Sequence, residues 1–126
     1  MAYVDGFLLA VPKKKVGAYQ KIARRAGQIW RDHGALQYVE CVGDDLKIAK
    51  VVSFNKRADI KAGEVPVFSW ILYTSRAHRD RVNKRVMNDP RMLKMVAGMK
   101  DQPQPFDMKR LAFSGFKTIV EMYGVK

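Results

Sequence analysis

The sequence is poor in the residue types from which recognisable metal, redox and cofactor sites are built. Cys41 is the single cysteine among 126 residues, so an intrachain disulfide is impossible and nothing indicates an oxidising compartment. There are only two histidines, and neither a Cys-x-x-Cys nor a His-Glu-x-x-His pair occurs, which excludes zinc sites of the usual spacing. A glycine-rich phosphate loop and a Gly-x-Ser-x-Gly turn are also missing. We therefore expect no metal site and no resident cofactor.

Long hydrophobic runs are missing as well. The apolar run near the N-terminus, "FLLAV", follows an acidic residue rather than a basic segment, and it is far shorter than the roughly 20 residues that span a bilayer. It therefore predicts neither a signal peptide nor a membrane anchor. The expected location is the cytoplasm, with no membrane partner.

Acidic residues are scarce relative to basic ones. The 12 Asp and Glu residues face 24 Lys and Arg residues, which gives a formal charge of +12. Such a balance attracts anionic partners in general, such as nucleic acid, anionic lipid or acidic small molecules, without specifying one. The hydrophobic content of 48% and the length indicate one globular domain over residues 1–126.

The order of hydrophobic patterns predicts the fold class. Apolar alternation indicates strands, spacings of three and four indicate helices, and Asp89-Pro90 interrupts the second helical stretch. The expected strands are 3–11, 35–45, 65–75 and 109–124, and the expected helices are 16–33 and 76–99, broken at 89–90. The order β-α-β-β-α-β predicts an α+β, ferredoxin-like fold: a four-stranded antiparallel sheet with both helices on one face. The segment 46–64 is a short strand or an irregular arm of unassigned role.

The strand "VPVFSWILYTS" is apolar on both faces. Val67, Ile71 and Tyr73 face one way, whereas Phe68, Trp70 and Leu72 face the other. A strand of this kind must be covered on both faces, and two helices cover only one. The same face of a second copy is the simplest cover, so we expect a homodimer packed through its sheets.

His33 and His78 are the candidate catalytic residues. The topology places the end of the first helix and the start of the second at the same end of the domain, where a neutral imidazole could act as a general base. Tyr38, Trp70 or Tyr73 would line the same site, with Arg79 nearby. Capping or surface roles for the two histidines are the alternative reading.

Glu40 lies in the middle of a predicted strand, where a buried carboxylate needs a partner. Arg110 on the last strand is the expected partner, either as a structural ion pair or as a pair that orients a ligand. Cys41 points to the opposite face and is expected to be a small core residue. The loop that contains Phe106 and Asp107 is either a plain connector or a cover over the pocket.

Several long phrases together resemble one protein family. They are "YVDGFLLAVPKKK", "WRDHGALQYVECVGDD", "VFSWILYTSRAHRD", "VMNDPR" and "PFDMKRLAFSGF". Over nearly the whole chain the sequence resembles the YbaA-like family, bacterial domains of unknown function. This resemblance implies a ferredoxin-like subunit of the dimeric α+β barrel type and brings no activity. The residues that match the family's recurring positions are His33, Tyr38, Glu40, Cys41, Trp70, His78, Arg79, Asp80, Asp107 and Arg110.

Two hypotheses about function follow. The first is a homodimer that binds a small anionic or aromatic metabolite in each subunit, with or without a cofactor-free reaction. The second is an RNA-associated basic protein. The fold also hosts RNA-recognition domains, but the third predicted strand carries its aromatic residues without a basic residue among them, which counts against binding of RNA on the sheet face.

Overall fold

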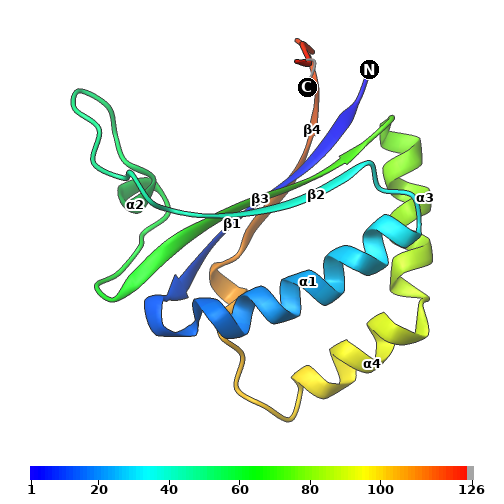
Figure 1. The fold of residues 1–126 in the computed structure, drawn as a ribbon, viewed down its shortest axis with the longest axis horizontal. Coiled ribbons are helices and arrows are strands. Elements are labelled where there is room, and N and C mark those ends of the chain that lie inside the picture. The colour runs from blue at the N-terminus through cyan, green and yellow to red at the C-terminus, as the bar shows by residue number, and fades with distance from the viewer. Residues whose placement is uncertain (125–126) are drawn as a thin grey trace.

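The computed structural model describes residues 1–124, which form a sheet with helices on one side (Figure 1). In this part of the chain no helix is long and apolar enough to cross a bilayer. The elements are β1 (Tyr3–Pro12), α1 (Val16–Asp32), β2 (Gln37–Val42), α2 (Phe54–Arg57), β3 (Glu64–Tyr73), α3 (Arg76–Met87), α4 (Pro90–Met99) and β4 (Ala112–Lys117), with 3-10 turns at Lys13–Lys15 and Met108–Arg110.

The sheet has the order β2-β3-β1-β4, and each neighbouring pair is antiparallel. β1 and β3 form the centre, with Tyr3 opposite Tyr73 and Pro12 opposite Glu64. Helices α1, α3 and α4 all lie on the same side of the sheet (Figure 1). The predicted α+β, ferredoxin-like fold is therefore confirmed.

The two faces of β3 have the predicted division. Val67, Ile71 and Tyr73 are buried beneath the helices, whereas Phe68 is 44% exposed on the other side. The side chains directed away from the helices give that side an apolar surface, which we call the open face. It is formed by Val4, Leu8, Val39, Phe68, Trp70, Leu72, Ala112 and Phe116.

The second helical stretch breaks where the sequence predicts. α3 begins after Ser75, whose hydroxyl accepts a hydrogen bond from the backbone N–H of His78 at 3.1 Å. Asp89 caps α4 through the N–H of Arg91 at 2.8 Å, and Pro90 occupies the first helical position, where its missing N–H costs nothing. The break turns α4 back beneath α1 (Figure 1).

The expectations about the bounds of the last strand and the burial of Cys41 are wrong. The closing strand spans only Ala112–Lys117 instead of 109–124, because residues 108–110 form a 3-10 turn capped by Asp107, and Lys117 already pairs with Tyr3 at the start of β1. Cys41 is exposed rather than in the core. It points away from the helices as predicted, but nothing in residues 1–124 covers the open face at this position of the edge strand.

The segment between β2 and β3 is an irregular arm that contains only the short helix α2. Phe54 of this arm packs its ring edge-on against Phe68, with the centroids 5.8 Å apart. The arm therefore lies on the same side of the sheet as the open face (Figure 1).

A candidate ligand cavity around Glu40

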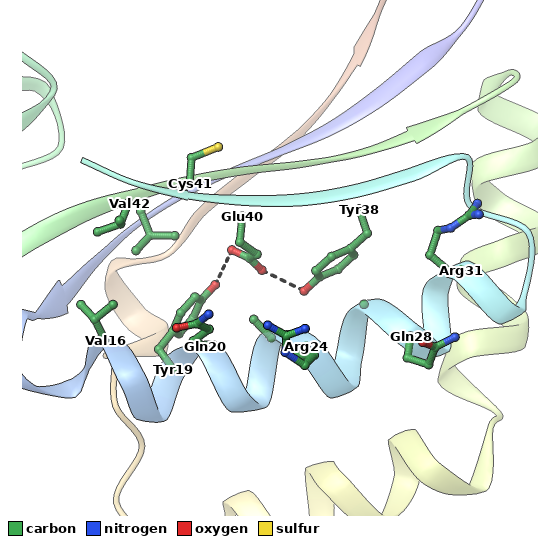
Figure 2. A pocket seen from close by; sticks show the side chains of 13 residues that line it. Val16, Tyr19, Gln20, Arg24, Gln28, Arg31, Tyr38, Glu40, Cys41 and Val42 are labelled. Atoms are coloured by element: carbon green, nitrogen blue, oxygen red, sulfur yellow. Dashed lines mark hydrogen bonds between the residues drawn. The ribbon is translucent and has the colours of Figure 1, made fainter. Parts of the chain in front are cut away.

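Glu40 is held by two tyrosine hydroxyls between β2 and α1. Tyr19 donates to Oε1 at 2.8 Å and Tyr38 donates to Oε2 at 2.8 Å. Tyr38 and Glu40 are two positions apart on β2, so both side chains point to the helix side, and Tyr19 reaches up from α1 (Figure 2). The carboxylate is thus fixed from both sides by neutral donors.

Burial raises the pKa of both tyrosines, and the neighbouring charge of Glu40 raises it further. Both phenols therefore stay protonated at physiological pH and remain donors. Among the salt bridges formed by residues 1–124, none involves Glu40. A partly buried carboxylate without a cation is unusual, because ionised groups inside proteins are normally paired.

Gly27 makes room for this arrangement. A Cβ at this position of α1 would lie 2.6 Å from Cδ1 of Tyr38, closer than carbon atoms approach in proteins. Glycine in the middle of a helix costs roughly 1 kcal/mol relative to alanine. The close approach of the Tyr38 ring gives that cost a structural reason.

Glu40 borders a cavity of about 250 Å³ between the sheet and helices α1 and α4. Its lining is dominated by aromatic rings and methionines, and it contains no Lys, Arg or His. The sheet contributes two polar side chains to the lining, Glu40 of β2 and Ser69 of β3, which lie opposite each other in the register of these two strands. The aromatic and methionine members are Phe7, Tyr19, Trp30, Tyr38, Phe106, Met92, Met95, Met99 and Met108, and Trp70 borders the cavity from β3 although its ring packs on the open face.

A second, more open groove runs along the outer side of α1 and β2 and shares Glu40 and the two tyrosines with the cavity (Figure 2). Arg24 and Arg31 line this groove. Arg31 donates to the backbone carbonyls of Ala35 and Leu36, so its charge is directed toward the end of the helix rather than toward Glu40.

His33 and His78 lie at the same end of the fold but do not line the cavity. Nε2 of His33 is 2.7 Å from Oδ2 of Asp89, in a network that Arg91 completes. Hydrogen bonds from Arg91 and His33 hold the pKa of Asp89 well below its usual range. Nδ1 of His78 accepts the backbone N–H of Thr74 at 3.0 Å. These contacts match the capping and surface reading of the two histidines.

Arg79 and Tyr73 belong to a buried cluster near the start of β1, next to His78, whose ring packs edge-on against that of Tyr73. Arg79 donates from Nη1 to Oδ1 of Asp5 at 2.8 Å, and Asp5 is only 1% exposed. Asn83 accepts from the hydroxyl of Tyr73 at 3.2 Å and from the indole N–H of Trp30 at 3.0 Å. Sequence reasoning missed Asp5, although an acid inside the apolar run "YVDGFLLAV" is a readable signal for a buried pair.

The predicted pair of Arg110 with Glu40 is wrong. Arg110 instead makes a bidentate contact with Glu64, at 2.7 Å and 2.9 Å, and lowers the pKa of that carboxyl to about 2. The reason is topological: Arg110 lies in the turn before β4, at the edge of the sheet opposite β2, and not on a strand beside Glu40.

The remaining candidates divide between the two sides of the sheet. The ring of Trp70 packs against Phe68 on the open face, and its N–H donates to Gln37 at 3.3 Å. The loop residue Phe106 packs edge-on against Tyr19, with the centroids 5.5 Å apart, and lines the cavity. The sequence left open whether this loop is a connector or a cover, and in the structure Phe106 forms part of the cavity wall. The role of Tyr19 in the site was missed, because its helical spacing is equally typical of an ordinary core position.

The chain matches a family described as "Protein of unknown function (DUF1428)" over residues 2–108. The uncharacterized protein YbaA of Escherichia coli strain K12 is 40% identical over 121 residues, which cover 96% of this chain and 99% of that protein. YbaA of Shigella flexneri gives the same values.

Among solved structures, similarity at low identity supports the fold. A nipsnap family protein of unknown function from Agrobacterium tumefaciens has a TM-score of 0.56 at 14% identity, covering 93% of this chain and 87% of that one. A protein described as dimeric and ferredoxin-like, from an uncultured marine organism, has a TM-score of 0.52 at 13% identity, covering 97% and 100%. Together with the sequence match, these findings show that the chain is a member of the DUF1428 family and has a ferredoxin-like fold.

Proposed function

We propose that this protein is a homodimer that binds a small, largely aromatic ligand in the cavity between the sheet and helices α1 and α4. The observation that carries the proposal is the cavity itself: about 250 Å³, enclosed mainly by aromatic and methionine side chains, with a single carboxylate fixed at its edge. Binding sites for small molecules commonly combine an apolar lining with a few placed polar groups.

The lining favours an aromatic ligand over an anionic one. An anion inside the cavity would meet Glu40 and would find no basic side chain among the lining residues. The basic residues that produce the net charge of +12 lie outside the cavity lining, and Arg24 and Arg31 line the outer groove instead. The net positive charge of the chain therefore does not support an anionic ligand in the cavity.

The open face supports the dimer. Phe68 is 44% exposed and Phe116 is 57% exposed, and they lie among other apolar side chains on a single sheet surface. Large contiguous apolar surfaces mark interaction sites. The similar solved structure described as dimeric and ferredoxin-like supports a second copy as the partner.

RNA is the less favoured occupant of the same face. The outward positions of the four described strands carry aromatic rings but no Lys or Arg. RNA-binding sheets stack bases on aromatic residues but rely on cations for the phosphates. An apolar sheet without cations fits a protein surface better.

The cavity is tested by calorimetric titration with 2-phenylethanol, a neutral aromatic probe, in wild type and in Ala26→Leu. Ala26 lines the cavity, so the larger side chain fills part of its volume and should abolish binding. Ala18→Leu is the matched control, because Ala18 is exposed on the same helix. Equal binding by wild type and Ala26→Leu would contradict the cavity as the site.

The dimer is tested by light scattering on wild type and Phe116→Asp. A charge among the apolar side chains of the open face should convert the dimer to a monomer of half the mass. Leu93→Asp is the matched control, because Leu93 is 56% exposed on α4, away from the sheet. A wild-type protein that is monomeric at micromolar concentration would refute the dimer.

A further inference from the structure

We propose that the ligand of the cavity is a protonated amine with an aromatic or aliphatic body, and that the ammonium group binds Glu40. This inference rests on the proposed function, that the cavity holds a small ligand, and it adds the charge and chemical class of that ligand. The carboxylate would accept from the ammonium while the apolar body fills the space toward α4.

The hydrogen bonding of Glu40 leaves room for such a partner. Each carboxylate oxygen accepts one tyrosine hydroxyl, at 2.8 Å in both cases. An ionised carboxylate offers about four acceptor positions, so about two are left. The tyrosines orient the group without neutralising it, because both remain protonated and uncharged.

The charge of Glu40 is not balanced by the protein within the described residues. None of the ion pairs in residues 1–124 includes it, whereas Asp5, Glu64 and Asp89 are each paired with an arginine. A carboxylate taken out of water is costly unless it is paired. A bound ammonium would supply the missing partner at the cavity edge.

The walls suit a cation with an apolar body. Rings of Phe7, Tyr19, Trp30, Tyr38 and Phe106 surround the space, and four methionines line it. Aromatic faces attract ammonium groups, and the attraction grows when water is excluded. Methionine adapts its shape to varied apolar groups. An alcohol or a hydrocarbon would use these walls but would leave the carboxylate uncompensated.

The overall charge of +12 does not prevent this binding. Fields of surface charges fall off over a Debye length of about 8 Å at physiological ionic strength. Within the lining, Glu40 is the single ionisable group besides the protonated tyrosines. The carboxylate of Glu40 is therefore the only formal charge among the residues that line the cavity.

The test compares three probes of nearly the same size by isothermal titration near pH 7: 2-phenylethylamine, 2-phenylethanol and phenylacetate. In the wild type we expect the amine to bind about tenfold more tightly than the alcohol, the factor that a charge-assisted hydrogen bond typically contributes. Phenylacetate should bind most weakly. This comparison requires no variant.

The decisive variant is Glu40→Gln, which keeps the shape of the side chain and removes its charge. The preference for the amine over the alcohol should disappear, while binding of the alcohol changes little. Asp45→Asn is the control, because it removes one carboxylate at an exposed position outside the cavity. It should keep the preference.

The outcomes separate the two proposals. Binding of the alcohol as tight as that of the amine overturns the inference about the amine and leaves the cavity as a binding site. A preference for the amine that survives in Glu40→Gln also overturns it. Absence of binding by all three probes contradicts the proposed function itself.

Discussion

Removing the positive charge of Arg79 should leave Asp5 as an uncompensated charge in the interior. Asp5 lies on the helix side of the central strand β1 and is 1% exposed, and Arg79 of α3 contacts it at 2.8 Å. The substitution Arg79→Met keeps most of the apolar stem and removes the guanidinium, whose carbon lies 5.0 Å from the centroid of the Tyr3 ring. In the unfolded chain the carboxylate of Asp5 is fully hydrated, whereas in the folded variant it stays buried without a cation. The substitution therefore destabilises the folded state relative to the unfolded state.

Breaking a buried pair in this way costs roughly 3–5 kcal/mol. The lower end applies here, because the side chain of Arg79 is 15% exposed and the polar groups of Asn83 and Tyr73 also favour the charged form of Asp5. We expect a loss of about 3 kcal/mol in the free energy of unfolding and a Tm lower by roughly 10 °C. Urea denaturation followed by circular dichroism, at one fixed protein concentration, measures the first quantity.

The loss should depend on pH in a defined direction. Burial raises the pKa of Asp5 above its ordinary value of 3.8, and Arg79 opposes that rise. Without Arg79 the pKa of Asp5 in the folded protein rises further, so the folded state binds the proton more tightly than the unfolded state. The stability that protonation provides is complete below pH 3.8 and is lost as pH rises through the folded pKa. The deficit of Arg79→Met relative to wild type should therefore be largest near neutral pH and should shrink toward pH 3.8.

The double variant Asp5→Asn with Arg79→Met checks the cause. If the deficit comes from the orphaned carboxylate, neutralising it should restore most of the lost stability, and the coupling between the two positions should be comparable to the loss itself. A loss below about 1 kcal/mol in Arg79→Met, which is typical of an exposed pair, would refute the reasoning. A double variant less stable than Arg79→Met would refute it as well.

Three further predictions concern Gly27, Glu64 and Ser75. Gly27→Ala should lower stability by about 1 kcal/mol in urea denaturation, because displacement of the Tyr38 ring outweighs the gain in helix propensity; a higher Tm would mean that the ring moves freely. The pKa of Glu64 is lowered from 4.5 to about 2, so the contribution of this carboxylate to stability is complete above pH 4.5 and is lost as pH falls toward 2. In thermal melts between these two pH values, Glu64→Gln should therefore lose less stability than wild type. Ser75→Ala removes the cap of α3 and should cost about 1 kcal/mol in the same denaturation assay, with no effect expected if solvent replaces the cap fully.

Local patterns were sufficient to predict the fold. Alternation along β3 separates Val67 and Ile71 from Phe68 and Trp70, and both the cap at Ser75 and the break at Asp89-Pro90 are visible within a few residues of sequence. These features depend on backbone geometry and on how regularly the side-chain directions repeat along a strand or helix. Both can be recognised within a short stretch of sequence.

The partners of charged side chains could not be predicted in the same way. Arg110 reaches Glu64 across 46 positions, and Tyr19 reaches Glu40 across 21. Such pairs are determined by the order of strands in the sheet and by where each strand stops. An error of three residues in the start of β4 placed Arg110 on a strand and assigned it the wrong carboxylate. Cys41 is exposed because it points away from the helices on an edge strand, which the alternation of apolar residues alone does not reveal.

The strand order also has a consequence for how the chain folds during synthesis. β1 is synthesised before both of its neighbours in the sheet. The residues that it pairs with on β3 are about 60 positions later in the sequence, and Lys117, the partner of Tyr3 on β4, is more than a hundred positions later. Helix α1 can form early, but the strand that precedes it has no sheet to join until β3 is complete. Pairings between such distant segments slow folding and leave apolar strands unpaired for longer. The apolar run "FLLAV" at the centre of the finished sheet is therefore the segment that most needs protection while the protein is being made.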